Sequence, residues 1–253
     1  MYPAIVTVRL SSSRLPSKAL LRLGGYSVLQ FVIERARAGG MTPFVFTSSD
    51  SSDDPILSEA RHAGAPVFRG NLENKVDRWA RGFEAFDLED GHLVDADDPF
   101  FDPVSCLLSL DKLRNSAEKY VILPSKLSDS GEAYVGTSIT RLGLQRAASE
   151  LDRLSIFDTD VVPWGSIFGQ NEMGRSDESA GSPRFRLTLD YAEDFKVIKK
   201  LSKEFDYKTP RADIEEYLLR SPDLIAINFF RNQQFLENKA NHLRRNGVQH
   251  APR

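Results

Sequence analysis

The sequence predicts an α/β fold in which a mixed, mostly parallel sheet is sandwiched between helices. Short apolar runs, typical of buried strands, alternate with longer segments of helical periodicity through the first half of the 253 residues. Strand–helix–strand alternation implies right-handed crossovers and parallel neighbouring strands. Apolar residues make up 41% of the chain and charged residues 27%, a balance typical of a globular protein with a large core.

The first half of the chain alternates regularly. Residues 4–8 form an apolar run that predicts the first strand. In the helix expected at residues 27–38, Ser27 and Gln30 form a capping box, and Gly39-Gly40 ends the helix. Further strands are expected at residues 43–47, 66–68, 92–95 and 120–123, and further helices from Asp54-Pro55, at 73–86 and at 103–114.

The second half is less regular. We expect strands within residues 133–140 and at 185–189, and helices at 141–151, 190–205 and 209–219. Residues 165–183 contain four glycines and four serines, which predicts a mobile loop. Residues 241–253 are polar and basic, and we expect a flexible tail there.

Composition excludes several classes of protein. The net charge of −3 gives no overall field that would attract nucleic acid. No stretch approaches the roughly eighteen apolar residues of a membrane span, and no signal-peptide pattern is present, so we expect a cytoplasmic protein. The single cysteine, Cys106, lies in an apolar segment, which favours a packed thiol. The four histidines lack the spacing of metal ligands.

The loop after the first strand carries the most informative pattern. Residues 9–18 contain three cations (Arg9, Arg14 and Lys18), four serines and one proline. The cations can neutralise a polyphosphate, while serine hydroxyls and loop N–H groups can donate to its oxygens. The alternative interpretation is a solvated basic turn.

Acidic residues follow the strand expected at residues 92–95. Asp95 and Asp97 would share a face of an extended chain. Two such carboxylates can hold a hard cation such as Mg²⁺, which takes phosphate oxygens as further ligands. Asp-Asp-Pro is also common turn chemistry, and for Asp98 the turn is the favoured interpretation.

Asp190 is a second candidate metal ligand. It follows the strand expected at residues 185–189 and precedes a helix. Asp190 and Glu193 have the spacing of a capping box, which typically contributes about 1 kcal/mol. Spacing alone favours the cap, although one carboxylate oxygen could cap while the other reaches a metal.

Four segments together resemble a known family, the CTP-dependent cytidylyltransferases that activate sugar acids. Residues 9–18 resemble the signature Arg-x-Gly-Ser-x-Arg-Leu-Pro-Gly-Lys, and residues 186–194 are similar to Arg-Leu-Thr-Val-Asp-x-x-Glu-Asp. Residues 68–79 and 96–100 match the family's Arg-Gly segment with its following helix and its Gly-Asp-x-Pro-Phe motif. The family includes the 3-deoxy-manno-octulosonate and acylneuraminate enzymes, and the motifs also resemble those of its spore-coat polysaccharide biosynthesis protein F branch.

The resemblance implies the Rossmann-like nucleotide-diphosphosugar transferase fold and a single domain at residues 1–240. Residues 1–125 would bind the nucleotide, residues 126–205 the sugar and a second subunit of a homodimer, and residues 206–240 would form C-terminal helices. It also implies transfer of CMP from CTP to a sugar hydroxyl, with release of pyrophosphate.

The resemblance also implies roles for individual residues. Residues in contact with CTP would be Arg9, Leu10, Ser11, Ser12, Ser13, Arg14, Lys18, Arg78 and Asp97. Asp97 and Asp190 would hold Mg²⁺, with Asp95 as a further ligand or a base, and Arg14, Lys18 and Asp97 would be catalytic. Trp164 would either wall the sugar pocket or pack in the core.

Three positions depart from the family pattern. Ser11, Ser17 and Ala96 stand where the family has glycine, which matters if the backbone there needs a positive φ. Two alternatives therefore remain open. One is a glycosyltransferase of the same fold that binds a nucleotide sugar through Asp95-x-Asp97. The other is a nucleotide-binding homologue without activity.

Overall fold

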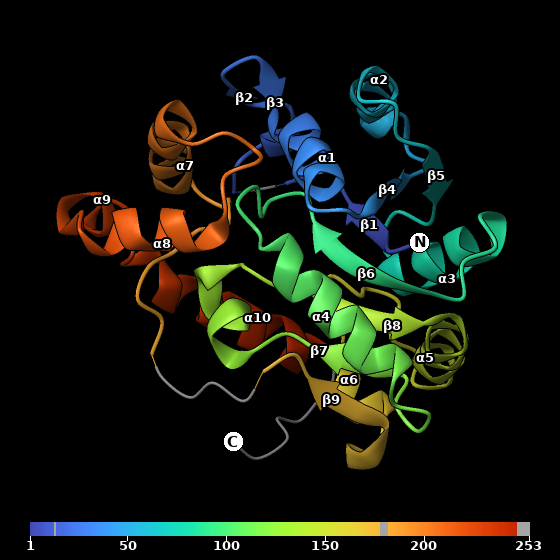
Figure 1. Ribbon diagram of the computed structural model, residues 1–253. Coiled ribbons are helices and arrows are strands. Elements are labelled where there is room, and N and C mark those ends of the chain that lie inside the picture. The colour runs from blue at the N-terminus through green and yellow to red at the C-terminus, as the bar shows by residue number, and fades with distance from the viewer. Residues whose placement is uncertain (13, 178–181, 247–253) are drawn as a thin grey trace.

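The computed structural model describes residues 1–12, 14–177 and 182–246. Within them, a sheet of seven strands has the order β5-β4-β1-β6-β8-β7-β9 (Figure 1). The strands are β1 (Pro3–Thr7), β4 (Thr42–Ser48), β5 (Val67–Gly70), β6 (Asp90–Asp95), β7 (Val121–Leu123), β8 (Thr137–Thr140) and β9 (Met173–Arg175). In this sheet β8 pairs antiparallel with both neighbours and the other pairs are parallel, which confirms the predicted fold class.

Helices cover both faces of the sheet. In β1, Ala4 and Val6 face one core cluster, whereas Ile5 faces another, as the alternation of a strand requires. The first cluster packs against α1 (Val28–Ala38), α2 (Asp54–His62) and α4 (Pro103–Arg114), and the second against α3 (Lys75–Ala85) and α5 (Arg141–Arg153). A small hairpin, β2 (Arg22–Leu23) with β3 (Tyr26–Ser27), precedes α1.

A third core cluster lies beside the sheet. It contains α7 (Ala192–Glu204), α8 (Arg211–Leu219) and α9 (Pro222–Ala226), at the left of Figure 1. Two more helices, α6 (Trp164–Ile167) and α10 (Arg231–Arg245), follow α5 and α9 along the chain. No helix in the described ranges has both the length and the apolar character needed to cross a membrane.

Several local predictions are confirmed. The Ser27 side chain accepts from the Gln30 amide at 3.1 Å, and the Gln30 side chain accepts from the Ser27 amide at 3.0 Å. This is the predicted capping box of α1. Helix α4 has the predicted bounds, and Cys106 within it is buried.

Other predictions were wrong. Residues 185–189 form no strand, because the Leu187 amide donates to Gly131 and the Leu189 amide to Asp97, two different loops, so no ladder forms. Segment 165–183 contains α6 and β9 in its described part instead of being all loop. The expected tail is helical through Arg245, while residues 247–253 lie outside the described ranges.

Candidate active site

The site lies where two central strands end. Thr7 of β1 and Asp95 of β6 are partners in the parallel register, so the loops that follow both strands begin at the same edge of the sheet. A cavity of about 540 Å³ opens at this edge. Ligands in open α/β sheets bind outside the carboxyl ends of strands. The topology therefore brings the cationic loop and the acidic residues to one cavity.

A buried carboxylate holds the cationic loop in place. The Leu10 amide donates to Asp53 Oδ1 at 2.7 Å, and the Asp53 carboxylate also accepts from Thr47 Oγ1 at 3.2 Å and from Ser48. Leu10 packs in the core and does not line the described cavity. Through Asp53, the backbone of the loop that follows β1 is thus hydrogen-bonded to the end of β4.

A chain of ion pairs joins the loop to Asp190. The Asp190 Oδ1 atom accepts from Arg14 at 2.8 Å and from Lys18 at 3.0 Å, and Lys18 also pairs with Asp97. The other carboxylate oxygen of Asp190 accepts from Arg186 at 3.0 Å. Four predicted site residues far apart in the sequence are thereby brought together: Arg14, Lys18, Asp97 and Asp190.

The charges in this chain stabilise each other. Burial opposes ionisation of Asp190, but the positive charges of Lys18 and Arg14 outweigh it and hold the pKa of Asp190 well below its usual range. Burial likewise opposes the charge of Lys18, whose pKa is nevertheless raised by Asp97 and Asp190. Both groups are therefore ionised at neutral pH.

Asp190 does not cap α7, contrary to the expectation from spacing. The Asp194 carboxylate accepts from the amides of Asp190 and Tyr191, both at 2.9 Å, and satisfies the helix start. Asp194 is in turn paired with Arg186 at 2.9 Å. The alternation Leu187, Thr188, Leu189, Asp190 persists without a strand, because the leucines enter the core while Thr188 and Asp190 line the cavity.

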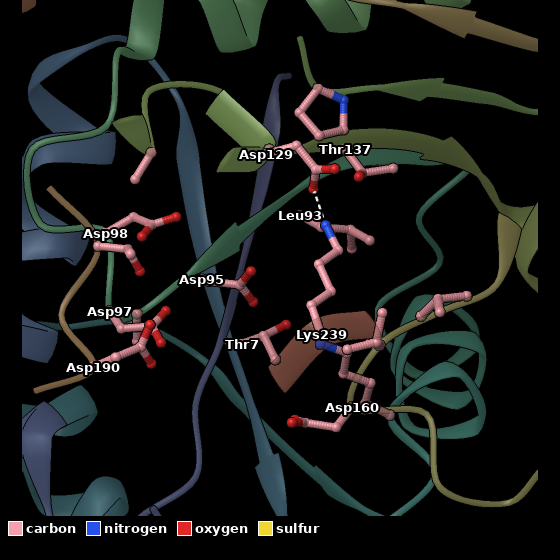
Figure 2. A pocket seen from close by; sticks show the side chains of 18 of the residues that line it. Thr7, Leu93, Asp95, Asp97, Asp98, Asp129, Thr137, Asp160, Asp190 and Lys239 are labelled. Atoms are coloured by element: carbon pink, nitrogen blue, oxygen red, sulfur yellow. Dashed lines mark hydrogen bonds and ion pairs between the residues drawn. The ribbon is translucent and has the colours of Figure 1, made fainter. Parts of the chain in front are cut away.

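Three carboxylates gather at the end of β6. One oxygen from each of Asp95, Asp97 and Asp98 lies within 4.8 Å of the others (Figure 2). Burial raises the pKa of Asp98, and the charges of Asp97 and Asp95 raise it further. The Asp98 Oδ1 atom is buried without a hydrogen-bond partner in the described chain. Such a cluster suits a hard divalent cation, and it includes Asp98, which the sequence had assigned only to a turn.

A second cationic group lies at the start of α3. Arg9 donates to the Leu72 carbonyl at 2.7 Å and pairs with Asp160 at 3.1 Å. Arg78 donates to the Asn71 carbonyl at 2.5 Å, and burial with the nearby charge of Arg9 lowers the pKa of Arg78 to about 10. Its buried Nε and Nη2 atoms have no partner within the described ranges, so two donors are available in the cavity wall.

The remaining residues predicted for the site differ in whether they line the cavity. Ser11 and Ser12 line the cavity, whereas Ser13 lies outside the described residues. Trp164 lines the cavity and also packs against the core. Ser17 has a φ of 52°, the left-handed conformation that favours glycine, whereas Ser11 and Ala96 have no positive φ.

Sequence reasoning missed Asp53, Arg186 and α10. The sequence around Asp53 indicated only the start of a helix. The sequence around Arg186 did not indicate its partners, because these are set by the tertiary fold. Residues of α10 line the cavity, whereas the sequence predicted only C-terminal helices and a flexible tail in this region.

Solved structures share the sheet topology of this chain. A cytidylyltransferase from Leptospira borgpetersenii has the same fold, with a TM-score of 0.79 at 22% identity, covering 88% of this chain and 95% of that one. CMP:2-keto-3-deoxy-manno-octonic acid synthetase complexed with CTP also shares it, with a TM-score of 0.59 at 16% identity, covering 81% and 99%.

The sequence comparison is more specific. The family described as cytidylyltransferase matches residues 3–156, more than half of the chain, so this protein belongs to the cytidylyltransferase family. It is also 25% identical over 228 residues to the spore coat polysaccharide biosynthesis protein SpsF of Bacillus subtilis, covering 87% of this chain and 94% of that protein. The predicted family resemblance is thus confirmed.

Proposed function

We propose that this cytidylyltransferase transfers CMP from CTP to a hydroxyl of a sugar acid and releases pyrophosphate, in a reaction that depends on Mg²⁺. The observation that carries the proposal is the convergence of Arg14 and Lys18 with Asp97 and Asp190 at the carboxyl edge of the sheet. Two relatives support the choice of substrates and pathway: CMP:2-keto-3-deoxy-manno-octonic acid synthetase, which is complexed with CTP, and a spore coat polysaccharide biosynthesis protein.

The cationic loop is proposed to bind the triphosphate. Arg14 and Lys18 would donate to β- and γ-phosphate oxygens, for which guanidinium and ammonium groups are well suited. Their carboxylate partner Asp190 holds both cations at the cavity, which would preorganise them for the triphosphate. Ser11 and Ser12 would add hydroxyl donors.

The nucleoside is proposed to lie towards Arg9 and Arg78. The unpartnered Nε and Nη2 atoms of Arg78 are buried donors that a ribose or base oxygen would satisfy. Arg9 is positioned by Asp160 and the Leu72 carbonyl beside the same wall. Ser13 and Leu10 belong to the proposed contact set through the resemblance; the Leu10 amide, however, already donates to Asp53.

The acidic residues fit a divalent cation. Asp97 and Asp190 are the proposed ligands, and Asp95 and Asp98 lie with Asp97 in the acidic cluster. A bound Mg²⁺ would neutralise phosphoryl oxygens and increase the electrophilicity of the α-phosphorus.

In the proposed reaction, an acceptor hydroxyl oxygen bonds to the α-phosphorus while the bond to the bridging oxygen of pyrophosphate breaks. Desolvation in the cavity wall and the charge of Asp97 raise the pKa of Asp95, which is the proposed acceptor of the hydroxyl proton. Membership of the cytidylyltransferase family favours this reaction over glycosyl transfer.

Pyrophosphate release with CTP, Mg²⁺ and a panel of sugar acids tests the proposal. Asp97→Asn, Asp190→Asn and Lys18→Ala should each lower turnover by about a hundredfold or more, the effect of losing about 2.7–4 kcal/mol of transition-state stabilisation. Asp152→Asn and Lys203→Ala are matched controls at exposed positions of α5 and α7. Near-normal turnover in all three site variants would refute the site, and CTP binding without turnover on any acid would favour an inactive homologue.

We also propose the division into a nucleotide half (1–125), a sugar and dimer half (126–205) and C-terminal helices, with action in the cytoplasm as a homodimer. The exposed apolar side chains of Leu142, Leu154 and Phe157 in the second half support a subunit contact there. Light scattering should give a dimer mass that Phe157→Glu converts to the monomer mass. A monomeric wild-type protein would contradict this.

A further inference from the structure

Helix α10 presents one continuous face to the cavity. Its lining residues follow the spacing i, i+3, i+4, i+7 and i+8 of a single helical face. They are Phe235, Asn238, Lys239, His242 and Leu243. The helix also packs against the turn at Ser128–Glu132, which follows β7. The C-terminal helix is therefore a wall of the cavity with both apolar and polar side chains.

Lys239 crosses this part of the cavity to Asp129. Its Nζ atom lies 2.5 Å from Asp129 Oδ1, and Figure 2 shows the side chain extended between helix and turn, apart from the acidic cluster. The two side chains are 28% and 48% exposed. An ion pair this exposed contributes little to stability, so Lys239 can exchange Asp129 for another carboxylate at low cost.

A second cation lies on the same side. Arg175 ends β9, beside Leu123 of β7, and its guanidinium donates to the Pro124 carbonyl at 2.8 Å. It lines the cavity and has no carboxylate partner among the described residues. Two lining cations, Lys239 and Arg175, thus lie on the side of Asp129, where Asp160 is already paired with Arg9, whereas the opposite side has clustered carboxylates.

We propose that Lys239 binds the carboxylate of the sugar-acid acceptor in place of Asp129, so that α10 selects acidic acceptors. The exchange replaces one carboxylate with another on the same ammonium group, and Arg175 adds positive charge on that side. This inference rests on the proposed function and assigns the acceptor-binding residue within it.

Four variants test this role. Lys239→Met keeps the aliphatic stem and removes the charge, while Lys239→Arg keeps the charge. Asp129→Asn removes the resident competitor. Arg244→Met is the matched control, because Arg244 is an exposed cation of the same helix that is absent from the described cavity wall.

The measurement is calorimetric affinity for 3-deoxy-manno-octulosonate and N-acetylneuraminate, with Mg²⁺ and an α,β-methylene analogue of CTP present, because the P–C bond of the analogue prevents release of pyrophosphate. Lys239→Met should weaken binding of the better acid by about tenfold or more, the loss of one charge-assisted contact. Lys239→Arg should stay within about threefold, and Asp129→Asn should tighten binding by about twofold to fivefold. Arg244→Met should match wild type, and the affinity for CTP alone should be unchanged throughout.

If Lys239 binds the anion, Lys239→Met should lower the affinity for the sugar acid and Asp129→Asn should raise it. If the ion pair is only structural, both variants should lower that affinity. The inference is overturned if Lys239→Met binds the acid as wild type does, if both variants weaken binding equally, or if a wild-type protein that binds CTP binds neither acid. Wild-type protein that fails to bind CTP would instead refute the proposed function, on which this inference depends.

Discussion

The two sides of the cavity hold their charges differently. On the loop side, the paired side chains of Lys18 and Asp190 are 13% and 3% exposed, and Arg186 beneath them is fully buried. On the α10 side, Lys239 and Asp129 are half-exposed. Buried, multiply paired charges form a rigid arrangement, whereas an exposed pair is easily exchanged. The difference fits a constant triphosphate on one side and a variable acceptor on the other.

The two sides of the cavity should differ most in how much their charged residues contribute to the stability of the protein. Arg186→Met removes the common partner of Asp190 and Asp194, leaving two buried carboxylates with a deficit of positive charge. Breaking such a network should lower the free energy of unfolding by about 3–5 kcal/mol. Lys239→Met should lower it by less than about 1 kcal/mol. Guanidinium titrations of both variants measure this, and equal losses would remove the distinction between the two sides.

A substitution of Asp98 should change stability by a smaller amount than Arg186→Met, and it should stabilise the protein instead of destabilising it. Burial and the charges of Asp97 and Asp95 raise its folded-state pKa, so Asp98 costs stability as pH rises above the unfolded-state pKa, near 4. Asp98→Asn should therefore raise Tm at pH 7 by about 2–4 °C, the shift that about 1 kcal/mol produces in a protein of this size. At pH 4 the gain should shrink. A lower Tm at pH 7, with no change for Asp152→Asn, would show that the carboxylate repulsion is absent.

The smallest change in stability is expected for a substitution of Ser17. Its left-handed conformation costs a non-glycine residue about 1–2 kcal/mol, although glycine also increases the entropy of the unfolded chain by about 0.4–1 kcal/mol. Ser17→Gly should thus stabilise the protein by about 0.5–1 kcal/mol without loss of turnover. Urea denaturation with an activity assay measures both, and destabilisation would mean that the serine side chain has a compensating contact.

The alternating strands and helices could be predicted because each follows from local periodicity and punctuation. Residues 103–114, for example, begin at a proline after a capping aspartate. The failures share a different cause. The amides of Leu187 and Leu189 donate to segments that are remote in sequence, and Asp194 instead of Asp190 caps α7 because Asp190 pairs with Lys18. Local patterns contain no information about such partners.

The residues of the candidate site also fall into two groups, those that local sequence patterns predict and those that only the tertiary fold reveals. The loop at residues 9–18 has a distinctive spacing of cations, so Arg14 and Lys18 could be predicted. Helix α10 reads as a polar segment, and only the tertiary fold reveals that one of its faces lines the cavity and that Lys239 meets Asp129.

The central claim is that the cationic loop binds a magnesium triphosphate. Titration calorimetry of Mg·CTP against wild type, Lys18→Ala and the control Lys203→Ala tests it most directly. The account predicts that wild type and control bind alike and that Lys18→Ala binds at least about tenfold more weakly, since a buried charge-assisted donor is lost. Equal affinity in all three proteins, or no binding of CTP to wild type, would contradict it.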